Sequence, residues 1–167
     1  MDKKSLRFKC QKTGECQKCG ECCSFKEKRF LRKDEDLYFR EKIYEKTGLV
    51  YIDPLYSFTI TVTPEEKIIL EKKAKALKLE LKLKPKRLSY NPEKDNFNVL
   101  DYTLVHDRCP FQKEDNSCMI YKFRPIHCRE FPHINFNNMV LEYPKNDKSD
   151  FGEIIKIAKK NIRKEKI

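Results

Sequence analysis

Glycine and long apolar runs are both scarce in this sequence. Its 167 residues include four glycines, at positions 14, 20, 48 and 152, so no glycine-rich loop for a nucleotide or for S-adenosylmethionine is visible. No run of about 18 apolar residues occurs, which argues against a membrane-spanning helix. The N-terminus, MDKKSLRFKCQ, lacks the apolar region of a signal peptide. We therefore expect a cytoplasmic protein without a membrane partner.

Negative charge is in deficit. The chain carries 37 lysines and arginines against 26 aspartates and glutamates, which gives a formal net charge of +11. A basic surface attracts nucleic acid, although the sequence shows no RNA-recognition motif and no DNA-reading helix. Solvated lysine-rich helices are the other interpretation, because 38% charged residues is typical of hyperthermophile proteins. A metal-stabilised, basic nucleic-acid-binding module therefore stays as an alternative function.

Cysteine is the residue in excess. Four of the eight cysteines lie within residues 16–23, and core packing does not explain that density. In a reducing compartment, many cysteines favour metal or redox chemistry over disulfides. Disulfides remain an alternative, since intracellular proteins of hyperthermophiles can contain them.

The early cysteine block reads CQKCGECC. Cys16, Cys19 and Cys22 are separated by two residues each, a spacing that lets a tight turn direct sulfurs at one metal centre. Gly20 gives that turn conformational freedom. Adjacent side chains rarely point at one spot, so either one of Cys22 and Cys23 binds metal or the two serve different centres.

The late cysteine block spans residues 106–133. Cys109, Cys118 and Cys128 are nine and ten positions apart, so they come from separate local elements. Three thiols leave a metal incompletely ligated, and we therefore predict that both blocks meet in space and share one centre. The predicted metal ligands are Cys16, Cys19, Cys22, Cys23, Cys109, Cys118 and Cys128.

Arginines and histidines flank the late cysteines. Arg108, Arg124 and Arg129 are candidate cofactor-binding residues, because guanidinium groups offset the negative charge of a thiolate centre. An equally weighted alternative is that these arginines form ion pairs with nearby acidic side chains. Any histidine could also ligate, although a lone histidine is more often a packed or exposed residue; the three are His106, His127 and His133.

The two blocks together resemble the CxxCxxCC family of zinc- or iron-chelating cysteine-cluster proteins. The early block matches at Cys16, Cys19, Gly20, Cys22 and Cys23. The late block matches at Cys109, Pro110, Phe111, Cys118, Ile120, Tyr121, Arg124, Pro125, Cys128, Arg129, Phe131 and Pro132. The family is similar to the cysteine-rich part of flagellin lysine N-methylases, which implies methylation of a protein substrate as an activity. For those enzymes an iron–sulfur cluster has been proposed as the working cofactor.

The choice of cofactor lies between an iron–sulfur cluster and zinc. Zinc sites usually come as two C-x-x-C knuckles, and the late block contains none. That absence favours a [4Fe–4S] cluster first and zinc second. The C-x3-C-x2-C spacing of radical enzymes is also absent.

The rest of the sequence predicts an α+β fold. We expect one domain, 1–167, with short strands and two or three helices around a cysteine-ligated metal centre. Its ligand blocks are 10–23 and 106–133, joined by a helix and strand segment, 34–105. Expected helices are 34–47, 64–78 and 152–166; expected strands are 56–62, 97–105 and 139–143, with an extended segment over 77–84.

Local signals support the second helix most strongly. Thr63 is placed as N-cap, Pro64 at the first helical position and Glu66 in a capping box. Because this helix has its own cap and apolar face, we expect it to survive metal removal in part, while both cysteine blocks unfold.

Overall fold

A computed structural model describes residues 18, 20–24, 32, 35–55, 59–131, 141–147 and 150–164. Cys10, Cys16, Cys19 and His133 lie outside the described residues. The fold is α+β, as predicted. In chain order its elements are η2 (Glu21–Cys23, a 3-10 turn), α1 (Asp36–Thr47), β1 (Leu49–Tyr51), β2 (Thr61–Val62), α2 (Pro64–Ala76), β3 (Leu83–Asn91), β4 (Asn96–Leu104), η3 (Tyr121–Phe123), α3 (Ile126–Glu130) and α4 (Phe151–Lys164).

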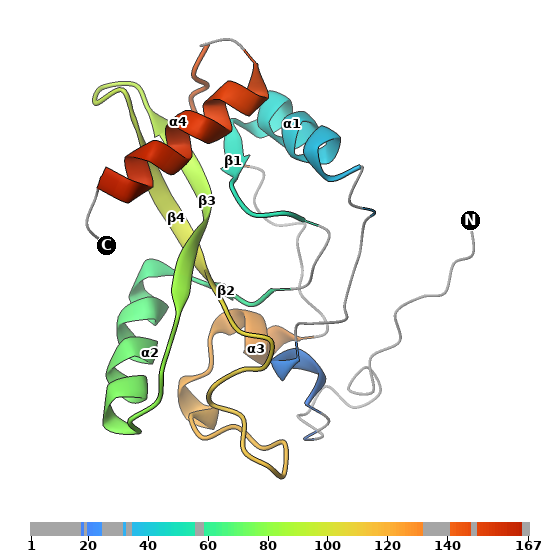
Figure 1. Ribbon diagram of the computed structural model, residues 1–167, viewed down its shortest axis with the longest axis vertical. Coiled ribbons are helices and arrows are strands. Elements are labelled where there is room, and N and C mark those ends of the chain that lie inside the picture. Colours follow the sequence, from blue (N-terminus) through green and yellow to red (C-terminus); the bar gives the residue numbers. More distant parts are fainter. Residues whose placement is uncertain are drawn as a thin grey trace.

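A long antiparallel hairpin, β3 with β4, forms the centre of the molecule (Figure 1). Short strands flank it, giving the strand order β1-β3-β4-β2, with β1 and β2 at the two edges. The pairing is irregular between Pro85 and Leu88. Since β1 pairs with one end of the hairpin and β2 with the other, the sheet carries different elements at its two ends.

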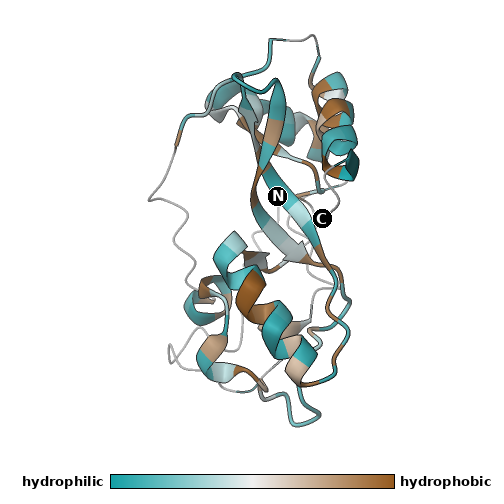
Figure 2. Cartoon of the chain, turned by 90° about the vertical axis from the view of Figure 1, so that its left-hand side faces the viewer, coloured by the Kyte–Doolittle hydropathy of each residue, from teal (hydrophilic) through white to brown (hydrophobic). Residues whose placement is uncertain are grey.

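Two separate apolar cores lie at the two ends of the sheet (Figures 1 and 2). The first, which we call the helical core, joins α1, β1 and α4 to the hairpin and consists of Tyr44, Val50, Ile52, Leu88, Phe97, Phe151, Ile154, Ile155 and Ala158. The second, the thiol-side core, joins β2 and α2 to the late block and consists of Ile60, Val62, Leu70, Ala74, Leu104, Phe111 and Ile120. Cys109, Cys118 and Cys128 pack against the second core.

The predicted start of α2 is confirmed. Thr63 Oγ1 accepts a hydrogen bond from Glu66 N at 3.2 Å, and Glu66 Oε2 accepts one from Thr63 N at 3.0 Å. Pro64 occupies the start of the helix, where its missing N–H costs nothing. Helix α1 also ends as expected, with Gly48 at φ 71° donating to Tyr44 O at 2.7 Å.

Other boundaries differ from the expectation. Strand β3 runs from Leu83 to Asn91, so only the end of the expected extended segment over 77–84 is paired as strand. The strand over 139–143 is wrong for its described part: residues 141–143 form no strand, and Tyr143 N donates to Thr47 O at 2.7 Å instead. The described residues form four α-helices, and the additional one is the short helix α3 in the late block. In the part of the chain described, none of the helices is long and apolar enough to span a membrane.

Candidate metal centre

The early and late cysteine blocks lie side by side. Cys109 N donates a hydrogen bond of 2.8 Å to Cys23 O, and Ser24 forms an antiparallel bridge with Arg108. Figure 1 shows η2 next to α3, although these segments are far apart in sequence. The prediction that the two blocks meet in space is confirmed.

One cavity collects all the described cysteines. Its volume is about 40 Å³, room for no more than a few water-sized groups. Its remaining walls are mostly apolar and include Ile60, Leu70 and Phe111, and none of the described residues that line it carries a carboxylate. The cysteines that line it are Cys22, Cys23, Cys109, Cys118 and Cys128.

Cys22 and Cys23 both face this cavity, which corrects the expectation that neighbouring thiols diverge. Their sulfurs are 3.7 Å apart. The 3-10 turn of η2 makes this possible: Cys23 N donates to Gly20 O at 3.1 Å, and Gly20 has φ 75°. A Cβ at position 20 would lie 2.6 Å from Gln112 Nε2, so only glycine fits this turn without displacing its neighbour.

Two of the thiols, Cys23 and Cys128, have raised pKa values and so lose a proton less readily than a free cysteine. The pKa of Cys23 is raised to about 12, mainly by a hydrogen bond with the Cys109 sulfur and also by burial. A hydrogen bond with Cys22 acts in the opposite direction and lowers this pKa. Burial raises the pKa of Cys128 well above its usual range, and the thiols of Cys22, Cys23 and Cys118 add to that shift. These sulfurs therefore stay protonated at neutral pH unless a cation takes the place of the proton.

A polar turn returns Cys118 to the site, as predicted. Lys113 N donates to Ser117 O at 2.9 Å, and Asn116 at the tip has φ 62°. Gln112 then bridges to Cys118, and Met119 N donates to Phe111 O at 2.9 Å. The buried Phe111 ring anchors this turn in the thiol-side core.

Of the three predicted arginines, Arg124 alone lines the cavity. Its Nε donates to Tyr121 O at 3.0 Å, its guanidinium carbon lies 3.8 Å from the centre of the Tyr121 ring, and its charge partly offsets the rise in the pKa of Cys128. Arg108 instead bonds Gln112 Oε1 and Lys113 O on the polar turn. The Arg129 side chain is exposed.

The two described histidines accept backbone hydrogen bonds. His127 Nδ1 accepts from Thr61 N at 2.8 Å, and His106 Nε2 accepts from Lys82 N at 2.9 Å. Burial, with Lys86 and Arg87 nearby, lowers the pKa of His127 to about 4, so its ring is neutral. Neither ring is among the residues that line the cavity.

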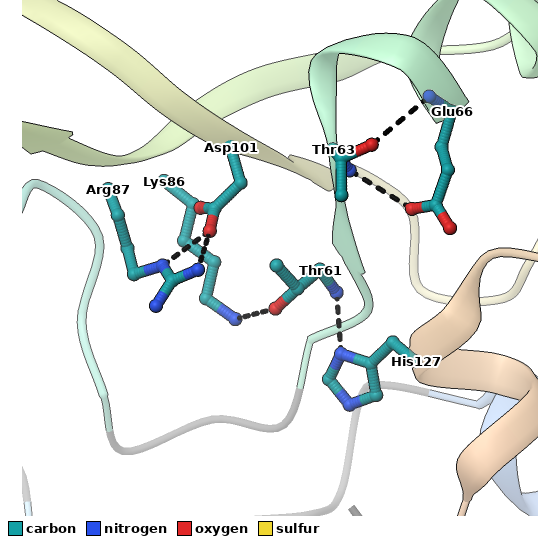
Figure 3. Close-up of polar contacts among 7 residues, drawn as sticks. All are labelled: Thr61, Thr63, Glu66, Lys86, Arg87, Asp101 and His127. Atoms are coloured by element: carbon teal, nitrogen blue, oxygen red, sulfur yellow. Dashed lines mark hydrogen bonds and ion pairs between the residues drawn. The ribbon is translucent and has the colours of Figure 1, made fainter. Parts of the chain in front are cut away.

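A partly buried polar band next to the site was not predicted from the sequence (Figure 3). Asp101 on β4 is 1% exposed and pairs with Arg87 on β3. Lys86 Nζ donates to Thr61 Oγ1 at 2.8 Å, and the backbone of Thr61 in turn reaches His127. The sequence does not predict this band, because only the pairing of β3 with β4 brings Lys86 and Arg87 close to Asp101.

The donor set fits a thiophilic metal. Among the described residues, no three histidine, cysteine, aspartate or glutamate side chains are already arranged as around an ion, and Cys16 and Cys19 lie outside them. Nevertheless, five thiols face one small cavity with apolar walls. Thiolates are the ligands that zinc and iron–sulfur iron prefer over magnesium or calcium.

Comparison with known proteins gives one match. The model of the CxxCxxCC family, described as "Putative zinc- or iron-chelating domain", matches residues 15–153. This range includes both cysteine blocks and the whole sheet between them. No curated protein and no solved structure matches the chain.

Proposed function

Because the chain belongs to the CxxCxxCC family, we propose that it chelates zinc or iron in the cavity lined by its cysteines. The observation that carries this proposal is the convergence of thiols on one cavity from two blocks, although Cys23 and Cys109 are 86 positions apart. The described ligands are Cys22, Cys23, Cys109, Cys118 and Cys128. Cys16 and Cys19 are further candidates by their two-residue spacing, and a tetrahedral ion would use four of these seven thiols.

The sulfur separation of Cys22 and Cys23 favours a single ion. Two sulfurs bound tetrahedrally to one zinc at about 2.3 Å each are about 3.8 Å apart. The observed separation is 3.7 Å. A mononuclear tetrahedral centre is therefore the first candidate, and the [4Fe–4S] cluster favoured by the sequence spacing is the second.

The protein's own residues set the properties of such a centre. Four thiolates around zinc form a closed structural site, whereas iron in the same position would support one-electron transfer. Arg124 at the cavity wall offsets the negative charge of the thiolates. The apolar side chains of Ile60, Leu70 and Phe111 form part of the cavity wall and limit the contact of the sulfurs with water.

Anaerobic purification followed by metal analysis and visible absorption spectroscopy tests this proposal. One zinc per chain without colour supports the structural site; iron without acid-labile sulfide supports a mononuclear iron centre; iron with sulfide supports the cluster. A metal-free protein with no titratable thiols after denaturation without reductant would overturn the proposal, because the cysteines would then be disulfide-bonded.

Two further activities, protein-lysine methylation and nucleic-acid binding, are also proposed. Protein-lysine methylation follows from the resemblance alone, and transfer of a labelled methyl group to a lysine-rich protein would test it. Nucleic-acid binding follows from the net charge of +11. It requires an affinity for RNA or DNA that falls steeply with salt.

A further inference from the structure

Cys128 lies in α3, a helix that is too short to be stable without contacts to the rest of the fold. Helix α3 has five residues, and its N-cap, Pro125, makes no side-chain capping bond. A helix of this length is unstable in isolation because too few hydrogen bonds offset the cost of nucleation. The location of the Cys128 sulfur therefore depends on what holds α3 against the rest of the fold.

The first anchor is the ring of His127. Its Nδ1 accepts the N–H of Thr61 at 2.8 Å (Figure 3). Thr61 belongs to β2, an edge strand whose outer amides have no partner strand. The ring is 9% exposed, so the bond is sheltered from water. His127 thus docks α3 onto the free edge of the sheet, one residue before Cys128.

The second anchor is Glu66 of α2. One of its carboxylate oxygens, Oε2, accepts the N–H of Thr63 at 3.0 Å and completes the cap of α2. The other, Oε1, accepts the N–H of Ile126 at 2.7 Å, which is the first residue of α3. One carboxylate therefore joins the starts of two helices that are 60 positions apart in sequence.

We propose that His127 and Glu66 are positioning residues for the Cys128 thiolate, and this inference rests on the proposed metal site. Together they fix the first turn of α3 from two directions, so that the sulfur enters the cavity at a set place. Groups that orient a metal ligand without touching the metal typically change metal affinity about 10- to 100-fold when removed. Neither residue needs to bind the metal to have this effect.

Metal transfer from the cobalt- or zinc-loaded protein to a chelator tests the proposal. We expect His127→Leu to release metal about 10- to 100-fold faster than wild type and to weaken the thiolate-to-cobalt absorption band. His127→Asn places an acceptor oxygen near the position of Nδ1 and should restore slow release. His106→Leu removes a bond of the same kind, to Lys82 N, away from the cavity lining, and should release metal at the wild-type rate.

Glu66 gives an independent comparison if His127→Leu fails to fold. Glu66→Gln keeps an acceptor oxygen and should stay near wild type, whereas Glu66→Met should accelerate release. Equal release rates for wild type, His127→Leu and Glu66→Met would overturn the inference while leaving the metal site intact. A wild-type protein that binds neither cobalt nor zinc would instead refute the proposed single-ion site.

Discussion

At the scale of residues, the thiols illustrate what sequence can and cannot foresee. Their spacing predicted that Cys109, Cys118 and Cys128 approach the early block, since incomplete ligand sets need partners. It did not predict that Cys22 and Cys23 face the same cavity, because this depends on the 3-10 turn after Gly20. Arg124 was one of three candidate arginines, and only the structure shows that it lines the cavity while Arg108 bonds the polar turn.

Replacement of Gly20 tests that turn. Alanine at φ 75° costs about 1–2 kcal/mol, and its Cβ would also meet Gln112 Nε2. We expect Gly20→Ala to weaken metal binding, measured by competition with a chelator. Gly152→Ala is the matched control, because Gly152 lies in α4 and has no positive φ. Equal metal affinity in both variants would show that the turn tolerates a side chain.

The cysteines themselves should differ in importance. Cys128→Ser is expected to lose most of the bound metal, because a hydroxyl is a poor ligand for a soft metal. Cys19, one of Cys22 and Cys23, and Cys118 should be as sensitive, with Cys16 and Cys109 next and Cys10 least. Metal content per chain measures the series. If Cys10→Ser empties the protein while Cys128→Ser leaves it full, the centre lies wholly in the early block.

Lys86 should make stability depend on pH. Burial lowers its pKa from 10.5 to about 8, so between these values the unfolded chain binds more protons than the folded one. The free energy of unfolding therefore rises with pH across this range. Relative to Lys86→Met, the wild type should gain about 2–3 kcal/mol from pH 7 to pH 10, measured by denaturant unfolding of the metal-free proteins. Lys75→Met, an exposed change on α2, should show no such pH-dependent difference.

At the scale of elements, helices with local signals were predictable and strands were less so. Thr63, Pro64 and Glu66 specify the start of α2 without help from the rest of the fold. Strand β3 contains Lys84, Lys86 and Arg87, and its lysine-rich pattern resembles a solvated segment until β4 pairs with it. The second role of Glu66, toward Ile126, has no local signature because its partner is far away in sequence.

The structure revises the expected behaviour of α2 when metal is removed. Its buried residues, Leu70 and Ala74, pack in the thiol-side core with Phe111 and Ile120 of the late block. Among the described residues, α2 therefore packs in the same core as the candidate metal site. After chelation we expect α2 and α3 to lose protection from hydrogen exchange, while α4 in the helical core retains it. Equal loss in α2 and α4 would contradict this division.

At the scale of the whole molecule, the partly buried polar band lies between the helical core and the thiol-side core. The sequence did not show that the apolar residues form two cores. Composition and length indicated one domain, and the apolar residues of each helix indicated a core. Which core each helix joins follows from the sheet order, with β1 and β2 at opposite edges of one hairpin. The described cysteines thus all lie at one end of the fold, on the far side of Asp101 and Arg87 from the helical core.

The contact between Cys23 and Cys109 also has a consequence for synthesis of the chain. These residues are 86 positions apart. At about 5–20 residues per second, a ribosome needs roughly 4–17 s to pass from one to the other. Throughout that interval the early thiols exist without their late partners, open to oxidation and to scavenging of stray metal. A centre that uses thiols of both blocks would therefore assemble only after the β3–β4 hairpin, which precedes Cys109 in the chain, has been made.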